Sequence, residues 1–210
     1  MEILTCINLQ KIICNSGYGK YLSQKLMLLS RSTAAHSTLY LNDTSSCIFQ
    51  KNKSINKVYG NSLTEKHKVI KKNYTDEKNF FSIVAAHNGY EKKFGYIHKR
   101  SIKILKKDDK IFGVDELRKT KNSPNNLYYF IRFHIYPNTK IVKTQAGNSI
   151  LISLPNGEGW LLHAEKNDLS IEKNIFLGNK NKIINNESIS ISGNIDEEII
   201  SIKWDIERVS

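Results

Sequence analysis

The sequence predicts an all-β protein built as a single antiparallel β-sandwich, and three observations support that class. Short apolar runs that alternate with polar residues recur about every ten residues, as the strands of a sandwich do. Turn-forming residues separate these runs, and helical spacing is scarce. The 210 residues show no internal repeat and no clear linker, so they predict one domain with a substantial core. We place this domain at 11–210 and leave 1–10 as an unassigned N-terminal segment.

The expected elements follow in chain order. One or two helical turns near Lys20–Leu29 are the only helix expected. In the first half of the chain, strands are expected at 67–74, at 80–87 and twice within 97–117, with a turn around Asp108–Lys110. In the second half, they are expected at 126–137, twice within 149–165 around the turn PNGEG, and at 169–177, 182–192 and 198–208.

The clearest of these strands is 126–137, NLYYFIRFHIYP, because its two faces separate cleanly. One face is apolar and carries Leu127, Tyr129, Ile131, Phe133 and Ile135. The other face carries Tyr128, Phe130, Arg132 and His134. Pro137 should end the strand, because proline cannot donate a hydrogen bond to the ladder.

Composition and charge exclude several function classes. No apolar run approaches the ~20 residues that a membrane span needs, so no membrane span is expected. The N-terminus also lacks the pattern of a signal peptide. The net charge of +12 suits an anionic partner, but the lysines are spread over nearly every loop. Because the chain shows no RNP-like motif, helix-turn-helix or zinc finger, no nucleic-acid partner is expected.

The cysteines and tryptophans are expected to be structural. Cys6, Cys14 and Cys47 form neither a CxxC pair nor a Cys/His metal spacing, and their odd number argues against a disulfide framework. Buried small thiols are the expected state. Trp160 and Trp204 are most simply core residues.

Five segments, in this order and spacing, resemble the C-terminal domain of heparinase II/III-like proteins. They are SRSTAAHSTLYLNDTSS, AAHNGYEKKFGYIHKRSIKI, VDEL, IRFHIYP and LPNGEGWLLHAE. The closing segment IKWDIERV is similar to the last strand of that domain, so the resemblance covers nearly the whole chain from about Lys11. It implies a β-sandwich that follows an α/α-toroid in the full-length enzymes.

The resemblance also implies a function. The family's enzymes are polysaccharide lyases of the bacterial cell envelope, which cleave uronic-acid-containing anionic glycans by β-elimination. That reaction needs a neutralised uronate carboxylate, a base and an acid, and in the family these groups lie on the toroid and just before the sandwich. We therefore expect no catalytic residue in this chain, and no activity without the toroid. The expected partners are an anionic polysaccharide and a toroid domain encoded upstream, in the cell envelope or periplasm. The alternative is a non-catalytic sandwich that binds anionic glycan.

His36 is the candidate metal ligand. The resemblance places it at a position whose histidine helps to bind a structural zinc in family members, and neutral imidazole suits zinc. However, Asn15 stands where the family has an aspartate, and the family's upstream histidine should lie before residue 1. The competing interpretation is a hydrogen-bonded His36 that ties its loop to a neighbour. No cofactor is therefore expected in this chain, while zinc is allowed in full-length relatives.

Four basic residues are candidates for substrate binding. His98 and Arg100 share a strand face with Ile102 and Ile104, and an arginine fork can bind a glycan carboxylate or sulfate. The alternative for this pair is an internal ion pair with an acid such as Asp115 or Glu116. Arg132 and His134 lie beside Tyr128 and Phe130, where aromatic rings either stack on sugars or cover a second sheet.

Overall fold

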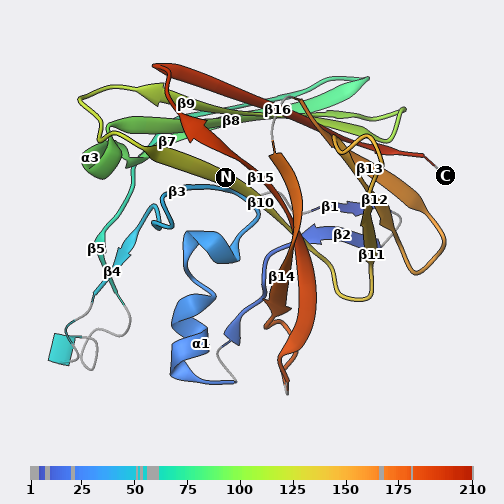
Figure 1. Ribbon diagram of the computed structural model, residues 1–210, viewed down its shortest axis with the longest axis horizontal. Coiled ribbons are helices and arrows are strands. Elements are labelled where there is room, and N and C mark those ends of the chain that lie inside the picture. The colour runs from blue at the N-terminus through green and yellow to red at the C-terminus, as the bar shows by residue number, and fades with distance from the viewer. Residues whose placement is uncertain are drawn as a thin grey trace.

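A computed structural model describes residues 5–7, 10–19, 22–50, 52, 54–55, 62–165, 168–180 and 182–209. Within these residues two antiparallel β-sheets pack face to face, with little helix, as Figure 1 shows. The predicted class, an antiparallel β-sandwich, is confirmed. None of the described helices is long and apolar enough to cross a membrane.

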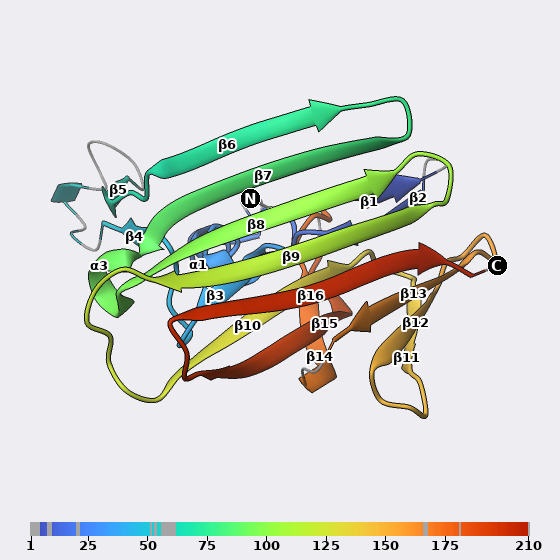
Figure 2. The same cartoon turned by 90° about the horizontal axis from the view of Figure 1, so that it is seen from above.

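The larger sheet forms the upper layer in Figure 1 and is seen from above in Figure 2. Its described strands are ordered β11-β12-β13-β16-β9-β8-β7-β6. Their bounds are β6 (Val69–Asp76), β7 (Phe80–Tyr90), β8 (Tyr96–Leu105), β9 (Lys110–Lys119), β11 (Lys140–Lys143), β12 (Ser149–Ser153), β13 (Gly159–Ala164) and β16 (Ile199–Arg208).

The smaller sheet lies beneath and follows the order β1-β2-β10-β15-β14, with β3 also paired to β10. Its strands are β1 (Thr5–Ile7), β2 (Gln10–Cys14), β3 (Leu39–Leu41), β10 (Leu127–Ile135), β14 (Asp168–Phe176) and β15 (Ile184–Ile195). The remaining described elements are the small ladder of β4 (Ile48–Phe49) and β5 (Leu63–Glu65), the helices α1 (Gln24–Leu29) and α3 (Glu91–Phe94), and the 3-10 turn η2 (Thr33–Ala35).

The core fills the space between the sheets, and it is built from the apolar faces of strands in which every second residue points inward. The predicted apolar face of 126–137 is at most 3% exposed at each of its five positions. Trp160 and Trp204 are both buried, as predicted. Across from Trp204, Gly113 of β9 leaves room for the indole, because a Cβ at this position would lie 2.0 Å from the ring. The sheets therefore meet through side chains that one added methyl group would disturb.

The alternating runs after residue 67 all fall on strands, with bounds that differ only at their ends. The helical turn expected near 20–29 is α1. It begins after Ser23, and the Ser23 side chain accepts a hydrogen bond from the Leu26 N–H at 3.1 Å. Residues 20 and 21 lie outside the described part. Strand β1 falls in the segment left unassigned, and the domain boundary at residue 11 stays a prediction.

Candidate functional site

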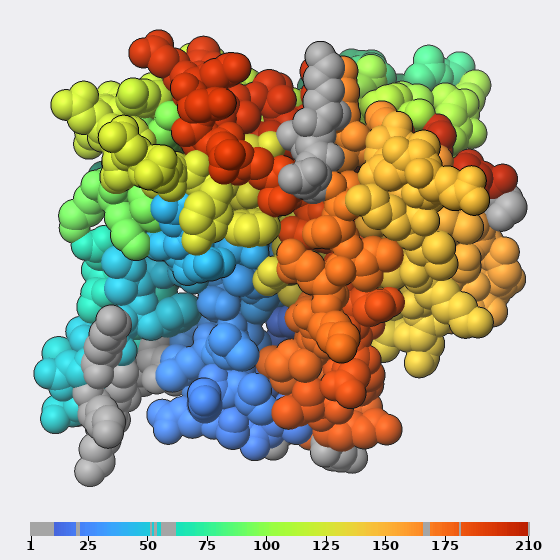
Figure 3. Space-filling view, viewed as in Figure 1, coloured from blue at the N-terminus to red at the C-terminus, as the bar shows by residue number. Residues whose placement is uncertain are grey.

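The turn η2 lies between two pockets that contain most of the predicted site residues. The first, which we call the histidine pocket, has a volume of about 210 Å³, and its walls include Arg31, Thr33, His36, Cys47, His67 and His87. The second, the Arg132 pocket, has a volume of about 140 Å³, and its walls include Ala34, Arg132, His134 and Asn174. The Arg132 pocket lies where the α1 segment meets β14, the blue and orange regions that adjoin in Figure 3.

Ser37, directly after His36, fixes this turn to both sheets. On the smaller sheet, its hydroxyl donates to the Cys14 carbonyl at 2.6 Å and accepts the His134 backbone N–H at 2.9 Å. Its own N–H donates to Oδ1 of Asn15 at 3.1 Å. On the larger sheet, its carbonyl accepts Nη1 of Arg100 at 2.8 Å. The segment that carries His36 is therefore positioned by hydrogen bonds rather than by helix or strand pairing.

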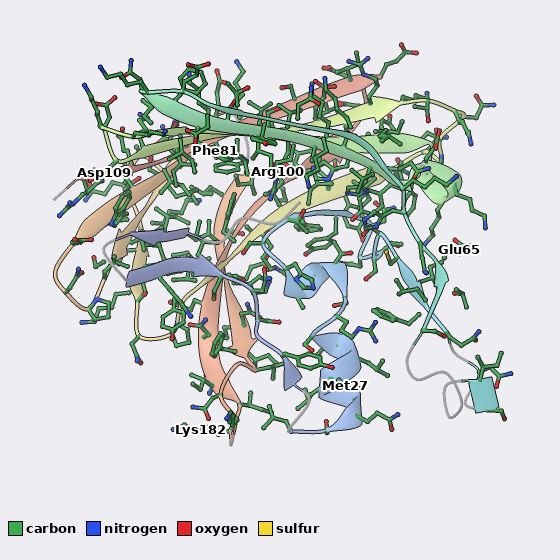
Figure 4. The ribbon with its side chains drawn as sticks, turned by 180° about the vertical axis from the view of Figure 1, so that it is seen from behind. Met27, Glu65, Phe81, Arg100, Asp109 and Lys182 are labelled. Atoms are coloured by element: carbon green, nitrogen blue, oxygen red, sulfur yellow. The ribbon has the colours of Figure 1, made fainter. Side chains whose placement is uncertain are left out.

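Arg100 and Asp115 form a buried ion pair beneath the larger sheet, where Figure 4 shows Arg100 between the two layers. Antiparallel pairing of β8 with β9 places the two residues opposite each other. The Asp115 carboxylate accepts four hydrogen bonds, from Arg100 Nε (2.7 Å), Arg100 Nη2 (3.0 Å), His98 Nε2 (2.7 Å) and Trp204 Nε1 (2.9 Å). Both oxygens are thus fully used, which is how a charge without solvent contact is stabilised.

The ionisation of this cluster follows from its contacts. Burial alone would raise the pKa of the Asp115 carboxyl, but the Arg100 charge and the hydrogen bonds from His98 and Arg100 outweigh it and hold that pKa below its usual value. For His98, burial lowers the pKa more than the neighbouring carboxylate raises it. The cluster is therefore an arginine–carboxylate pair with a neutral histidine donor.

A chain of hydrogen bonds leads from this pair to the histidine pocket. The Gly89 backbone N–H donates to Nδ1 of His87 at 3.1 Å, so this nitrogen carries no proton. The proton of neutral His87 is then on Nε2, which lies 3.1 Å from Nδ1 of His98 and donates to it. This leaves the His98 proton on Nε2, facing Asp115. The tautomers of both imidazoles are thereby assigned from the hydrogen-bond network.

His87, at the pocket end of this chain of hydrogen bonds, is neutral as well. Burial, reinforced by the charges around it, lowers the pKa of His87 to about 2. Its ring faces that of His67 at a centroid distance of 4.8 Å, and Nδ1 of His67 lies 3.0 Å from the sulfur of Cys47. Burial also lowers the pKa of His67. His87 therefore serves as a fixed wall of the pocket, since both of its ring nitrogens are occupied by protein groups.

Arg132 and His134 lie on the opposite side of η2. Nη2 of Arg132 forms an ion pair with Glu172 at 2.6 Å, and its guanidinium carbon lies 5.2 Å from the Tyr40 ring centroid. Nε2 of His134 donates to the Ala34 carbonyl at 3.0 Å, and Nδ1 accepts from Asn174. Burial lowers the pKa of His134 to about 4, so it is neutral. This pair therefore fastens η2 to the outer face of the smaller sheet.

The predicted site residues thus fall on three sides of one turn. Arg100 forms the internal ion pair with Asp115 that was the alternative expectation, and neutral His98 donates a hydrogen bond to the same carboxylate. Contact of His98, Arg100, Arg132 and His134 with glycan stays a prediction. His36 lines the histidine pocket. Among the described residues no three His, Cys, Asp or Glu side chains are arranged to hold a metal ion. The role of His36 as a metal ligand and the expectation of no cofactor both stay predictions.

Sequence reasoning missed Cys47, His67 and His87. His87 carried a usable signal, because the short turn Glu91–Phe94 between β7 and β8 places it opposite His98 in the ladder. Cys47 and His67 carried none, since they are 20 positions apart and are joined through the small β4–β5 ladder.

Solved structures of heparan sulfate lyase and heparinase III share the fold of this chain. Heparan sulfate lyase HepC from Pedobacter heparinus matches with a TM-score of 0.75 at 13% identity, over 98% of this chain and 29% of that chain. The structure titled Heparinase III-BT4657 gene product matches with a TM-score of 0.73 at 15% identity, over the same two shares. A further heparinase III structure has a TM-score of 0.64 at 14% identity, over 96% of this chain and 28% of its own. The chain thus spans under a third of the length of these enzymes.

Comparison with family models agrees with the structural likeness, although comparison with individual proteins does not contribute to it. No curated protein matches the sequence. The family model described as "Heparinase II/III-like, C-terminal" matches residues 3–205, which is nearly the whole chain. The residues that form the ion pair, the histidine chain and both pockets all lie within this range. On this evidence the chain belongs to the heparinase II/III-like family and corresponds to its C-terminal domain.

Proposed function

We propose that this chain is the C-terminal β-sandwich of a polysaccharide lyase that cleaves uronic-acid-containing anionic glycans by β-elimination. The observation that carries the proposal is the family match over residues 3–205. The likeness to heparan sulfate lyase structures, of which the chain spans 29%, supports a role as one domain of a larger enzyme. In this proposal the base and the acid lie on an α/α-toroid, and the enzyme works on polysaccharide in the cell envelope or periplasm.

The chemistry of the described histidines supports this division of labour. A general base must hold a free lone pair within hydrogen-bonding reach of the substrate proton. In His87, His98 and His134 both ring nitrogens are engaged by protein groups. These three imidazoles hold strands and the η2 turn in place and offer no free lone pair to a substrate, as expected if the base and the acid lie on the toroid.

A second candidate function is a free-standing module that binds anionic glycan without cleaving it. The net charge of +12 and the histidine pocket, whose described walls contain no Asp or Glu, favour binding of this kind. The two candidates share the substrate and differ in whether a toroid acts with the sandwich.

The test is an ultraviolet assay for the unsaturated uronate product of β-elimination, with heparan sulfate and alginate as substrates. The purified 210-residue chain should give no product, and co-expression with the toroid encoded upstream should produce it. Robust turnover by the chain alone, with contamination excluded, would show that the catalytic groups are misplaced. If no toroid is encoded upstream and the chain binds heparan sulfate, the module is the correct function.

A further inference from the structure

The histidine pocket has the composition of an anion site. Arg31 supplies a permanent positive charge, and His36 and the hydroxyls of Thr33 and Ser46 supply groups that can donate hydrogen bonds. None of the 20 Asp and Glu residues of the chain is among its described walls. The nearest carboxylate of the histidine chain, Asp115, is separated from the pocket by His87 and His98 and is already paired with Arg100.

The rim of the pocket is preformed. The Thr33 N–H donates to Oγ of Ser45 at 3.0 Å, and the Ser46 N–H donates to Oγ1 of Thr33 at 2.9 Å. The hydroxyls of Thr33 and Ser46 are themselves hydrogen-bonded at 3.2 Å. These bonds hold η2 against the segment that follows β3, so a ligand would meet an ordered rim and little ordering entropy would be lost.

Arg31 is positioned on one side of this rim. Its guanidinium carbon lies 4.7 Å from the ring centroid of Phe49, in the stacked geometry that orients an arginine fork. A planar guanidinium matches the two oxygens of a carboxylate or sulfate. The volume of about 210 Å³ is below the roughly 300–1,000 Å³ of sites for drug-sized ligands, which suits one charged substituent with part of its sugar ring.

A metal ion is a poorer match to the same walls. Both ring nitrogens of His87 are used by Gly89 and His98. The sulfur of Cys47 and Nδ1 of His67, which would have to face a metal, face each other at 3.0 Å. The part of the chain that the structure describes holds no group of three potential ligands around one point.

We propose that the histidine pocket binds a sulfate or carboxylate group of an anionic glycan, with Arg31 as its principal binding residue. This inference rests on the proposed function for the identity of the ligand, whereas its geometry is taken from the described residues of the sandwich. The pocket would give the sandwich a subsite of its own for one charged substituent of the polysaccharide.

The test is titration of the ¹⁵N-labelled 210-residue chain with sodium sulfate and, separately, with sodium glucuronate, at ionic strength held constant with chloride. Amide signals of Ser45, Ser46 and Cys47 should shift and saturate with at least one of the two anions. Saturation by sulfate alone identifies a sulfate subsite, and saturation by glucuronate alone identifies a carboxylate subsite. Binding should weaken about tenfold or more in Arg31→Gln, because this variant loses a hydrogen bond between two charged groups.

The matched control is Arg118→Gln, which removes the same charge from an exposed arginine on β9 that is paired with Glu116. It should bind as the wild type does, and thermal melting should show that both variants are folded. Absence of any saturable shift, or equal binding by Arg31→Gln and the wild type, would overturn the inference. Saturation of these amides by zinc chloride but by neither anion would overturn it too.

The outcome is separable from that of the lyase assay. Heparan sulfate cleavage by the chain with its toroid, unchanged in Arg31→Gln and without shifts at the pocket amides, would remove the subsite and leave the proposed function standing. Saturable anion binding at the pocket, without cleavage when the toroid is supplied, would do the reverse.

Discussion

Replacing Asp115 with Asn should destabilise the fold far more than the same change at the adjacent Glu116. In Asp115→Asn the Arg100 guanidinium stays charged and buried. The NH2 group of the new amide cannot accept a hydrogen bond and would face the N–H donors of Arg100, His98 or Trp204. Removal of one partner of a buried ion pair costs roughly 3–5 kcal/mol. For a chain of this size each kcal/mol lowers the melting temperature by about 2–4 °C, so Asp115→Asn should melt roughly 6–20 °C below the wild type.

Glu116→Gln is the matched control, because it changes the neighbouring residue on the same strand. Glu116 pairs with Lys99 at 3.1 Å on the opposite face of the sheet, and the Lys99 side chain is 32% exposed. Pairs with this much solvent contribute about 0–1 kcal/mol, so the control should melt close to the wild type. The measurements are thermal melting by circular dichroism and urea denaturation for each variant.

The double variant Arg100→Met with Asp115→Leu isolates the role of the charges. It removes both charges together and should recover much of the stability lost in Asp115→Asn. Recovery should be only partial, because the Trp204 N–H, the His98 Nε2–H and the Ser37 carbonyl lose their partners, and each such loss costs about 1–3 kcal/mol. If Asp115→Asn and Glu116→Gln melt together, the ion pair does not hold the sheets in the way described.

Two further outcomes are expected. The free energy of unfolding should fall by about 1–2 kcal/mol for each of His87 and His134 when the pH is lowered from 7 to 5. Their native pKa values are about 2 and about 4, whereas these side chains take up protons near pH 6.5 in the unfolded chain. Urea denaturation at several pH values should show this loss of stability, and the loss should be smaller in His134→Gln. A free energy of unfolding that does not change with pH would mean that these histidines are not held neutral. Gly113→Ala should lower the free energy of unfolding by about 1–3 kcal/mol, because its Cβ would overlap the Trp204 ring. The control Ser101→Ala, on the outer face of β8, should melt like the wild type. Equal melting temperatures of the two variants would contradict the close approach of Gly113 and Trp204.

Alternation in the sequence predicted long strands such as β8, β9, β10 and β16 because each of these has one face in the core and one outside. Strand β3 shows where this signal fails. All three of its residues, Leu39–Leu41, are buried, so the strand has no polar face to alternate with. The short strands β1, β4, β5 and β11 are too brief for a period-two pattern to be distinguished from chance.

The candidate site was predictable only as far as local pairing reaches. The shared parity of His98 and Arg100 placed them on one face, and Asp115 was a named partner because its strand follows directly. Trp204 contributes the fourth hydrogen bond to Asp115 from 89 residues away, through the pairing of β16 with β9. No local pattern reports such a contact, since it depends on the order of strands in the sheet.

The position of η2 between the two pockets has a thermodynamic consequence. Thr33 faces the histidine pocket and Ala34 faces the Arg132 pocket, so one three-residue turn is a wall of both. A ligand in one pocket that displaces this wall changes the shape of the other, and the two occupancies are then coupled. Such coupling is reciprocal: whatever factor the first ligand imposes on the affinity of the second, the second imposes on the first. Any two ligands that both move this turn would therefore bind interdependently rather than one at a time.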